Sequence, residues 1–397
     1  MRVLQINSVC GIRSTGRIAT DIYHTLKANG HECAVAYGRE NPQNIDINDT
    51  IKIGKNSDIM VHALMSRMTD KTGFYSKNAT KKLIERIKAY KPDIIQLHNI
   101  HGYYINMKVL FEYFKAADIP VVWTLHDCWT FTGHCAYYDF AGCDRWKTGC
   151  YSCPQKKEYP SSMLLDNSKR NYNKKSELFG GVKNLTFIAI SDWIASQAKE
   201  SFLKDKSITV IHNGIDLEQF KPTESDFRKK HNIEDKKILL GVASVWDRRK
   251  GFDTFMELSR KISDDEVIVM VGLSEERIEQ LPENVIGISR TDSVAELAQI
   301  YTAADVFVNP TMEEGLGLVN IEAQACGTPV ITYNTGGSPE CVSEKSGIVV
   351  PKGDVAALLD AIKHVDFKKE DILAHAARFD KTKKYEEYIE VYKRCLE

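Results

Sequence analysis

Short runs of β-branched and other apolar residues alternate with longer segments of helical periodicity along the chain. In the first half such runs lie at 3–6, 34–37, 94–98, 121–125, 187–190 and 209–211. The same rhythm starts again in the second half, with runs at 238–243, 267–271, 306–309, 330–332 and 348–350. Alternation of this kind is typical of parallel sheets covered by helices. The pattern therefore predicts an α/β protein with two sheets in tandem.

The break between the two rhythms predicts a domain boundary. A segment from His212 to Pro222 contains an Asn-Gly turn and a proline, and a charged stretch follows it to Lys237. A chain of 397 residues is also too long for one core of usual size. We therefore expect a first domain at 1–212, a second at 213–380, and a terminal helix at 381–397 that packs back on the first domain. The helix prediction rests on Tyr385, Tyr388, Ile389 and Tyr392, which recur at helical spacing.

The charge balance argues against nucleic acid as a partner. Lys and Arg number 53 against 54 Asp and Glu, which gives a net charge of -1. Neither a signal peptide nor a membrane-spanning run is recognised, so we expect a cytoplasmic protein. Basic residues cluster at 71–91 and 169–175. These clusters are either solvated helix faces or a surface for peripheral contact with anionic lipid at the inner face of the plasma membrane.

The chemistry is concentrated in the segment Glu314-Gly-Leu-Gly-Leu-Val-Asn-Ile-Glu322, which follows the predicted strand at 306–309. Glycines let a backbone approach a ligand closely, and a helix N-terminus favours a phosphate. Gly315 and Gly317 are therefore expected to expose the amides of Leu316, Gly317 and Leu318 as a phosphate cradle. An ionised Glu322 can accept both hydroxyls of a ribose, and Glu314 is placed to meet a sugar beyond the phosphates. The alternative is that the two glutamates are surface charges.

Several motifs in order make this chain resemble the family 4 retaining glycosyltransferases. Glu314-x7-Glu322 is followed by Ala-Gln-Ala-Cys-Gly-Thr-Pro-Val-Ile331, and a Gly-Gly-x-x-Glu turn ends at Glu340. The other matching segments are Ser14–Arg17, Thr124–Asp127, Ile190–Trp193, Asn213–Asp216 and Gly347–Asp354. The resemblance implies the GT-B fold, in which two Rossmann-like doubly wound parallel-sheet domains face each other across a cleft. The first domain would bind the acceptor and the second the nucleotide-sugar.

The resemblance also implies an activity. A hexosyl or N-acetylhexosaminyl unit would pass, with retention, from a UDP-sugar or GDP-sugar to a saccharide or lipid-linked saccharide during polysaccharide or glycoconjugate synthesis. No cofactor is required, and no Asp-x-Asp motif is positioned to hold a metal. Two alternatives remain open, a sugar-nucleotide epimerase of the same fold and a non-catalytic sugar-nucleotide-binding module.

The family's functional positions map onto individual residues. Gly16 and His126 hold the positions that face the donor from the first domain, and Asn213 belongs to another family motif. Lys250 aligns with the family's phosphate-binding lysine, but Ser244 stands near the position of the usual arginine, so Arg249, or less favourably Arg248, is the expected substitute. The candidate catalytic residues are His126, Arg249, Lys250 and Glu314. For His126 the alternative is a satisfied core histidine.

Four cysteines mark an insert at 128–155 in the first domain. Cys135, Cys143, Cys150 and Cys153 can supply the four thiolates of a structural zinc site, with Cys128 and His134 as further candidates. Buried or free thiols are the alternative, since disulfides are rare in the cytoplasm. The insert resembles a subgroup of bacterial glycosyltransferases of surface-polysaccharide synthesis. Its aromatic residues Tyr137, Tyr138 and Trp146 are either sugar-stacking faces or a local core.

Overall fold

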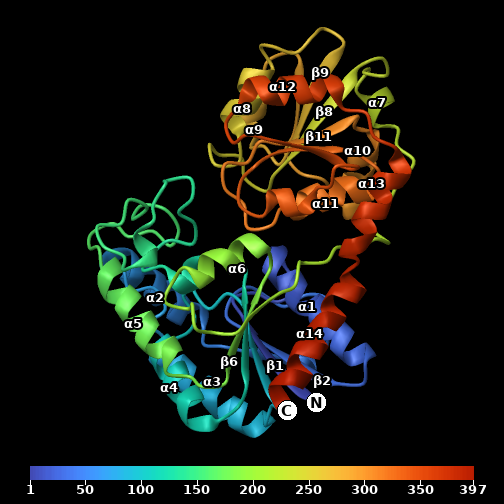
Figure 1. Ribbon diagram of the computed structural model, residues 1–397. Coiled ribbons are helices and arrows are strands. Elements are labelled where there is room, and N and C mark those ends of the chain that lie inside the picture. Colours follow the sequence, from blue (N-terminus) through green and yellow to red (C-terminus); the bar gives the residue numbers. More distant parts are fainter. The chain divides into compact units, whose positions relative to one another are not determined.

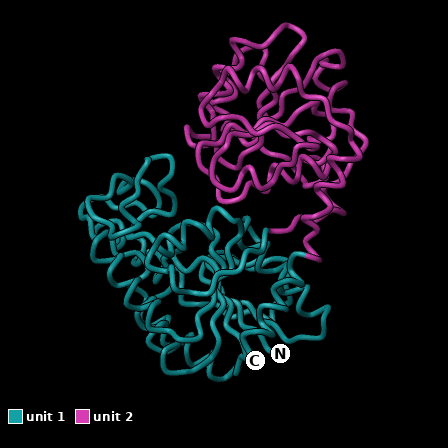
Figure 2. Tube along the Cα trace, viewed as in Figure 1, with its two compact units in different colours: residues 1–212, 384–397 teal, residues 213–383 magenta.

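The chain forms two α/β units, each built around its own parallel sheet (Figure 1). The computed structural model describes residues 1–397. Unit 1 comprises residues 1–212 and 384–397, and unit 2 comprises residues 213–383 (Figure 2). The chain therefore crosses between the units twice.

The sheet of unit 1 has seven parallel strands in the order β3-β2-β1-β4-β5-β6-β7. The strands are β1 (Arg2–Asn7), β2 (Glu32–Tyr37), β3 (Thr50–Lys52), β4 (Ile94–Leu97), β5 (Val121–Leu125), β6 (Leu185–Ala189) and β7 (Ile208–Val210). Its helices are α1 (Arg13–Ala28), α2 (Asn56–Thr69), α3 (Lys77–Tyr90), α4 (Met107–Ala117), α5 (Ser168–Gly180), α6 (Asp192–Lys199) and most of α14 (Lys381–Leu396). The strand order reverses between β1 and β4, which is where doubly wound sheets bind ligands, outside the carboxyl ends of the strands.

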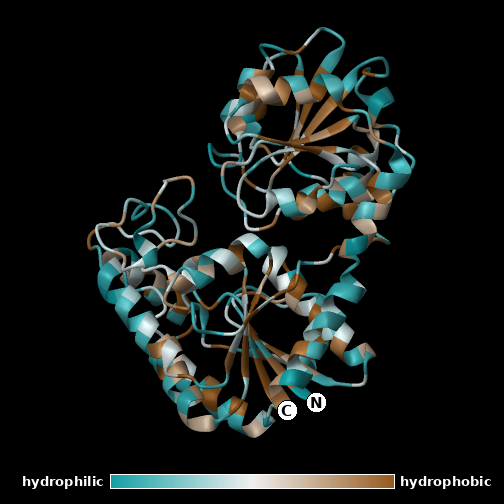
Figure 3. Ribbon diagram, in the orientation of Figure 1, coloured by the Kyte–Doolittle hydropathy of each residue, from teal (hydrophilic) through white to brown (hydrophobic).

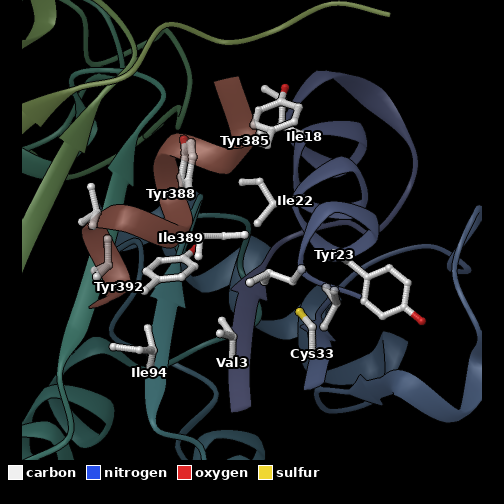
Figure 4. Packing of buried hydrophobic residues seen from close by; sticks show 14 of the residues in the cluster. Val3, Ile18, Ile22, Tyr23, Cys33, Ile94, Tyr385, Tyr388, Ile389 and Tyr392 are labelled. Carbon is white, nitrogen blue, oxygen red and sulfur yellow. The ribbon is translucent and has the colours of Figure 1, made fainter. Parts of the chain in front are cut away.

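Helix α14 belongs to the core of unit 1. Tyr385, Tyr388, Ile389 and Tyr392 are at most 5% exposed and pack with α1 and with the strand residues Val3 and Ile94 (Figure 4). Tyr392 also donates its hydroxyl to Gln96 Oε1 on β4 at 3.1 Å. The C-terminal segment thus completes one face of a sheet that begins at the N-terminus.

The sheet of unit 2 has six parallel strands in the order β10-β9-β8-β11-β12-β13. They are β8 (Lys237–Val242), β9 (Glu266–Val271), β10 (Val285–Ile288), β11 (Val306–Asn309), β12 (Val330–Tyr333) and β13 (Gly347–Val350). The helices are α7 (Phe227–Lys230), α8 (Phe252–Leu258), α9 (Glu275–Ile278), α10 (Val294–Ala303), α11 (Leu318–Ala325), α12 (Val355–His364) and α13 (Lys369–Ala376). Separate apolar clusters cover the two sheet faces, one with α8 and α12 and the other with α10 and α11.

The predicted fold class is confirmed, because both sheets are parallel and helices pack on both of their faces. The predicted strands are found within one or two residues, but the pattern missed β3 and β10. Both are short edge strands, and β3 has no fully buried residue, so their apolar signal is weak. Apolar residues concentrate on the strands in the interior of each unit (Figure 3). None of the helices combines the length and the apolar character that a membrane span requires.

The two chain crossings pair with each other inside unit 2. Ile215 N–H donates to Phe379 O at 2.8 Å, and Lys381 N–H donates back to Ile215 O at 2.9 Å. Lys381 Nζ also lies 2.8 Å from Asp216 Oδ2. This backbone bridge fixes the start of unit 2 against the start of α14.

Candidate active site

The loop between β11 and α11 carries the two glutamates of the sequence motif. It is held by the turn at 335–337, whose Gly337 N–H donates to Glu314 O at 3.1 Å. Gly336 has φ +54°, and a Cβ at this position would lie 1.8 Å from Glu314 O. Only glycine fits such a close approach in the left-handed region. The Gly-Gly turn therefore determines where the backbone of Glu314 lies.

Glu314 forms an ion pair with Lys250, which follows β8. Lys250 Nζ lies 2.5 Å from Glu314 Oε2, and the two side chains are only 22% and 16% exposed. Burial by itself raises the pKa of Glu314, but Lys250, Arg249 and the Gly315 N–H outweigh it and hold the pKa below its ordinary value. The carboxylate is therefore ionised at neutral pH, with Lys250 as its counter-charge.

The two arginines beside Lys250 have different surroundings. Arg249 is 31% exposed and donates from Nη1 to Glu313 O at 3.5 Å, whereas Arg248 is 81% exposed and pairs with Asp253 at 3.1 Å. The backbone O of Arg249 also accepts the Met312 N–H at 2.7 Å, which ties its loop to the loop of Glu314. Of the two, Arg249 is the one that adds positive charge to the glutamate loop.

The start of α11 presents backbone donors. Gly317 caps the helix at φ +96°, and the N–H groups of Leu316, Gly317 and Leu318 donate to no group of the protein. Next to Gly317, the buried Asn320 Nδ2 and Ser338 Oγ also lack hydrogen-bond partners. Unpaired donors and the helix dipole together favour an anion at this end. Leu318 is the first residue of the helix.

Glu322 lies in α11, about one turn beyond the donors. It is partly exposed, and its Oε2 accepts the hydroxyl of the fully buried Tyr301 at 3.0 Å. Burial and the neighbouring Glu322 raise the pKa of Tyr301, so the phenol stays protonated. Tyr301 thus orients the carboxylate.

In unit 1, His126 ends a chain of buried hydrogen bonds at the carboxyl end of β5. His126 Nε2 lies 2.9 Å from His98 Nδ1, and His98 Nε2 lies 2.9 Å from Gln5 Oε1. The Gln5 amide is oriented because its Nε2 donates to Ala19 O at 2.8 Å. Burial lowers the pKa of His98 well below its usual value and that of His126 to about 4, so both rings are neutral at pH 7.

This series of hydrogen bonds determines the tautomer of His126. A carbonyl oxygen accepts, so His98 Nε2 carries the proton and its Nδ1 is an acceptor. His126 Nε2 must then donate to His98, which leaves a lone pair on His126 Nδ1. His126 is therefore neither a charged group nor a donor at its remaining nitrogen, and it can accept a hydrogen bond from a hydroxyl.

A cavity of about 250 Å³ lies within unit 1, and Asp127, the residue after His126, is part of its lining. Residues that follow β1, β2, β4 and β5 line it together with Tyr137 of the insert and with Tyr159. They include Arg39, His101 and Asp127. Asp127 Oδ2 lies 2.9 Å from His101 Nε2, and His101 Nδ1 lies 3.1 Å from the Tyr159 hydroxyl. The cavity offers both hydrogen-bonding groups and an aromatic wall, which is the chemistry that saccharides require.

The remaining donor-site candidates are buried backbone positions. Gly16 lies in the first turn of α1, where its O accepts the Gly11 N–H at 3.0 Å and a Cβ would lie 3.0 Å from Val9. Gly16 therefore belongs to the beginning of a helix. Asn213 is 3% exposed, and its Oδ1 has no hydrogen-bond partner.

The four cysteines proposed as zinc ligands are all reduced, and Cys135 and Cys150 are buried. The neighbouring Cys135 thiol is the main cause that lowers the pKa of Cys153, to about 7. Cys150 Sγ accepts the Gly133 N–H at 3.1 Å. Beside them, the buried His134 bonds through Nδ1 to Asp70. Zinc ligation by this cluster stays a prediction.

The aromatic residues of the insert divide between the two roles considered. Tyr138 and Trp146 are at most 4% exposed and stack on each other at 4.7 Å, with Phe131 against Trp146. They form a small local core, and the sugar-stacking alternative is wrong for both. Tyr137 is only half-buried and lines the cavity.

Sequence reasoning missed several groups of this region. Gln5 and His98 lie inside predicted strands, where they resemble ordinary core residues. Arg39, His101 and Tyr159 belong to no recognised motif. For Arg39 and His101, the one available signal was their position after predicted strands. Asp127 lies inside a quoted motif but received no role.

The neutral state of His126 predicts acid sensitivity. Its pKa is about 4 in the folded chain against about 6.5 when unfolded, so the unfolded state binds the proton first as the pH falls. The contribution of the neutral His126 to the free energy of unfolding is complete above pH 6.5, and about 3 kcal/mol of it is lost by pH 4. Urea unfolding at several pH values should show this loss. The free energy of unfolding should fall less steeply with decreasing pH in His126→Gln than in the unaltered chain. An equal slope in both proteins would contradict a buried neutral imidazole.

Comparison with known proteins places the chain in a family. The family model described as Glycosyltransferase Family 4 matches residues 15–219, and the model described as Glycosyl transferases group 1 matches residues 236–365. A curated relative, described as a colanic acid biosynthesis glycosyl transferase (WcaC) of Escherichia coli strain K12, is 25% identical over 91% of this chain and 90% of its own length.

Solved structures share the fold at low identity. Sucrose-phosphate synthase from Thermosynechococcus elongatus has a TM-score of 0.71 at 18% identity, over 99% of both chains. Anabaena Alr3699/HepE, solved in complex with UDP, has a TM-score of 0.66 at 17% identity, over 99% of this chain and 100% of that one. Both sheets, the glutamate loop and the two matching family models lead to one conclusion: this chain is a glycosyltransferase of family 4 with the GT-B fold.

Proposed function

We propose that this chain is a retaining glycosyltransferase that moves a hexosyl or N-acetylhexosaminyl unit from a UDP-sugar or GDP-sugar to a saccharide or lipid-linked saccharide, in polysaccharide or glycoconjugate synthesis. The three unpartnered amides at the start of α11, beside the Lys250–Glu314 pair, carry the proposal. The name of the E. coli relative supports the polysaccharide context, and the UDP complex of the Anabaena protein supports the class of donor.

In this proposal unit 2 binds the donor. The amides of Leu316, Gly317 and Leu318 receive the diphosphate, and Glu322 accepts the ribose hydroxyls. Lys250, with Arg249 beside it, neutralises the charge that grows on the leaving diphosphate. When the Lys250 ammonium pairs with the diphosphate, it no longer pairs with Glu314. The Glu314 carboxylate can then accept a hydrogen bond from a hydroxyl of the donor sugar. Protein cations then do the work for which other enzymes use a divalent metal.

Unit 1 contributes the sugar contact and the acceptor site. Nδ1 of His126 accepts a hydroxyl of the transferred sugar, and Gly16 and Asn213 line the donor site. The cavity of unit 1 receives the acceptor, with Asp127 and Tyr159 as hydrogen-bonding groups. The leaving phosphate itself takes the acceptor proton, so the transfer needs no carboxylate nucleophile and proceeds with retention.

A donor panel tests the proposal directly. Purified full-length protein is incubated with UDP- and GDP-linked hexoses and N-acetylhexosamines, with and without EDTA, and release of UDP or GDP is measured. We expect slow hydrolysis of one donor that EDTA leaves unchanged, and NMR of an acceptor product should show the donor's anomeric configuration. Absence of both binding and hydrolysis for every donor would rule the proposal out.

The ribose contact predicts a specific loss of affinity. Glu322→Ala should weaken binding of the cognate nucleotide about 10- to 100-fold, because two hydrogen bonds to a charged acceptor disappear. Tyr301→Phe is the matched control, since it removes only the hydroxyl that orients Glu322. It should reduce nucleotide affinity much less. Calorimetry with free UDP and GDP measures both. Unchanged affinity in Glu322→Ala would remove Glu322 from the donor site.

We also propose that the insert holds a structural zinc through Cys135, Cys143, Cys150 and Cys153. The thiols of Cys135, Cys150 and Cys153 lie close enough to shift one another's pKa values, which supports a ligand cluster at this place. Elemental analysis of protein purified without added metal should find about one zinc per chain. Cys150→Ser should lose it and Cys395→Ser should keep it. Zinc well below one per chain in the unaltered protein would refute the site.

A further inference from the structure

Helix α2 exposes apolar side chains to solvent and buries polar ones. Its apolar residues Met60, Val61 and Leu64 are 72%, 60% and 60% exposed, and Ile59 and Met65 are half-buried. The residues that it buries fully are His62 and Ser66, each 1% exposed. His62 is held there by hydrogen bonds to Ser76 and to the Gly73 N–H. A surface helix of a globular protein normally turns its apolar side to the core. The apolar side of α2 is therefore built for something outside the unit.

A second segment extends this apolar surface. Met163, Leu164 and Leu165 are 74%, 64% and 51% exposed. The Met163 N–H donates to Arg67 O at 2.6 Å and the Leu165 N–H to Met68 O at 3.3 Å, so the segment runs along the C-terminal end of α2. We call the combined surface the α2 patch, and it consists of Met60, Val61, Leu64, Met68, Met163, Leu164 and Leu165. These are seven of the chain's fourteen exposed large apolar residues, a concentration that marks an interaction site.

The charges around the α2 patch identify the partner. Segments 55–71 and 156–170 contain seven basic residues, which are Lys55, Arg67, Lys71, Lys156, Lys157, Lys169 and Arg170. None of the seven forms an ion pair with an acidic residue, and Lys156 Nζ lies 3.4 Å from the backbone O of Leu164 inside the patch. Of the four acidic residues there, Asp58, Asp70 and Asp166 accept backbone N–H groups. Exposed apolar side chains within a rim of unpaired cations match the interface of an anionic bilayer.

We propose that the α2 patch docks unit 1 on the surface of an anionic phospholipid bilayer. The seven apolar side chains enter the region between headgroups and acyl chains, and the surrounding lysines and arginines contact the lipid phosphates. Long cationic side chains suit this place because their stems are apolar and their ends reach the headgroups. The proposal deepens the proposed function, on which it rests for its purpose: docking would bring the acceptor cavity of unit 1 to a lipid-linked saccharide.

The test uses the full-length chain and defined vesicles. Flotation with vesicles of phosphatidylethanolamine and about 30% phosphatidylglycerol should recover the protein, and vesicles of phosphatidylcholine alone should recover much less. The double variant Leu64→Glu/Met163→Glu should bind the anionic vesicles about ten- to a hundredfold more weakly, because it places two charges in the apolar surface. Ile47→Glu is the matched control, since Ile47 is 63% exposed elsewhere in unit 1, and it should bind like the unaltered chain.

The basic rim and the oligomeric state supply the opposing outcomes. Lys156→Glu/Lys157→Glu should reduce binding to anionic vesicles, and added salt should do the same. Equal vesicle binding by Leu64→Glu/Met163→Glu and the unaltered chain would overturn the proposal. So would a change from dimer to monomer in light scattering without any change in flotation, because the patch would then join two copies. Hydrolysis of the donor in vesicle-free solution reports on the transferase separately, so loss of either property is recognised independently.

Discussion

Lys250→Met is expected to lower kcat by about two to three orders of magnitude while changing donor affinity about tenfold at most. The diphosphate gains negative charge as the glycosidic bond breaks, so the ammonium stabilises the transition state more than the bound donor. Both constants are measured with the donor identified in the hydrolysis panel. Arg248→Met in the same loop is the control, because that side chain is 81% exposed and should leave kcat within about twofold.

A second substitution separates the catalytic role of Lys250 from its structural one. Without Lys250, the Glu314 carboxylate keeps only Arg249 and the Gly315 N–H as favourable neighbours, so its pKa rises and the fold loses about 1 to 3 kcal/mol. Glu314→Gln in the Lys250→Met background should restore stability, because it removes the uncompensated charge, yet should leave kcat low. Equal losses in kcat and donor affinity, or recovery of kcat in the double variant, would contradict the catalytic assignment.

Gly336→Ala is expected to reduce activity about a hundredfold and to destabilise unit 2. The new Cβ would lie 1.8 Å from Glu314 O, so one of the two backbone segments must move by more than an ångström. Displacement of this size at a reacting centre is enough for a loss of that order. Thermal unfolding and kcat on the same preparation measure the two effects.

The control for this prediction isolates the contact from the backbone strain. Gly30 also has a positive φ, +75°, but nothing lies within 4 Å of a Cβ placed there. Gly30→Ala therefore costs only the strain of a left-handed alanine, about 1 to 2 kcal/mol, and should leave activity intact. If Gly336→Ala were no worse than Gly30→Ala, the turn would not position Glu314.

The active-site loop of unit 2 is the part of the site that was most predictable. Glu314, the glycines and Glu322 are consecutive in the chain, so strand, turn and helix place them together by local geometry. Lys250 comes from the loop after a different strand, β8, and its contact with Glu314 arises because β8 and β11 are neighbours in the sheet. Arg249 and Arg248 are adjacent in sequence, so the sequence alone does not show which of them lies near Glu314. The folded loop distinguishes them, because it leaves Arg248 exposed and partly buries Arg249.

The hydrogen-bond chain to His126 shows the opposite case. Its members come from β1, from the end of β4 and from the end of β5, so Gln5 and His126 are 121 positions apart. Periodicity identifies each strand but not the order of strands within the sheet, which creates these contacts. The tautomer of His126 depends on that order.

The inverted helix α2 is a further feature that sequence patterns conceal. The spacing of Met60, Leu64 and Met68 predicts an apolar helix face in the same way as the spacing in α14 does. In α14 that face is buried, and in α2 it is exposed. A one-dimensional pattern records which residues share a face but not what covers it.

By itself the sequence determined the α/β class, most of the strands, the terminal helix and the family, because these follow from local periodicity and from motifs of neighbouring residues. Only the tertiary structure decided that Lys250 neutralises Glu314, that His126 is a neutral acceptor, and that the α2 patch lies outside the core. These properties depend on contacts between distant segments and on burial, which sets both the pKa values and the fate of an apolar face.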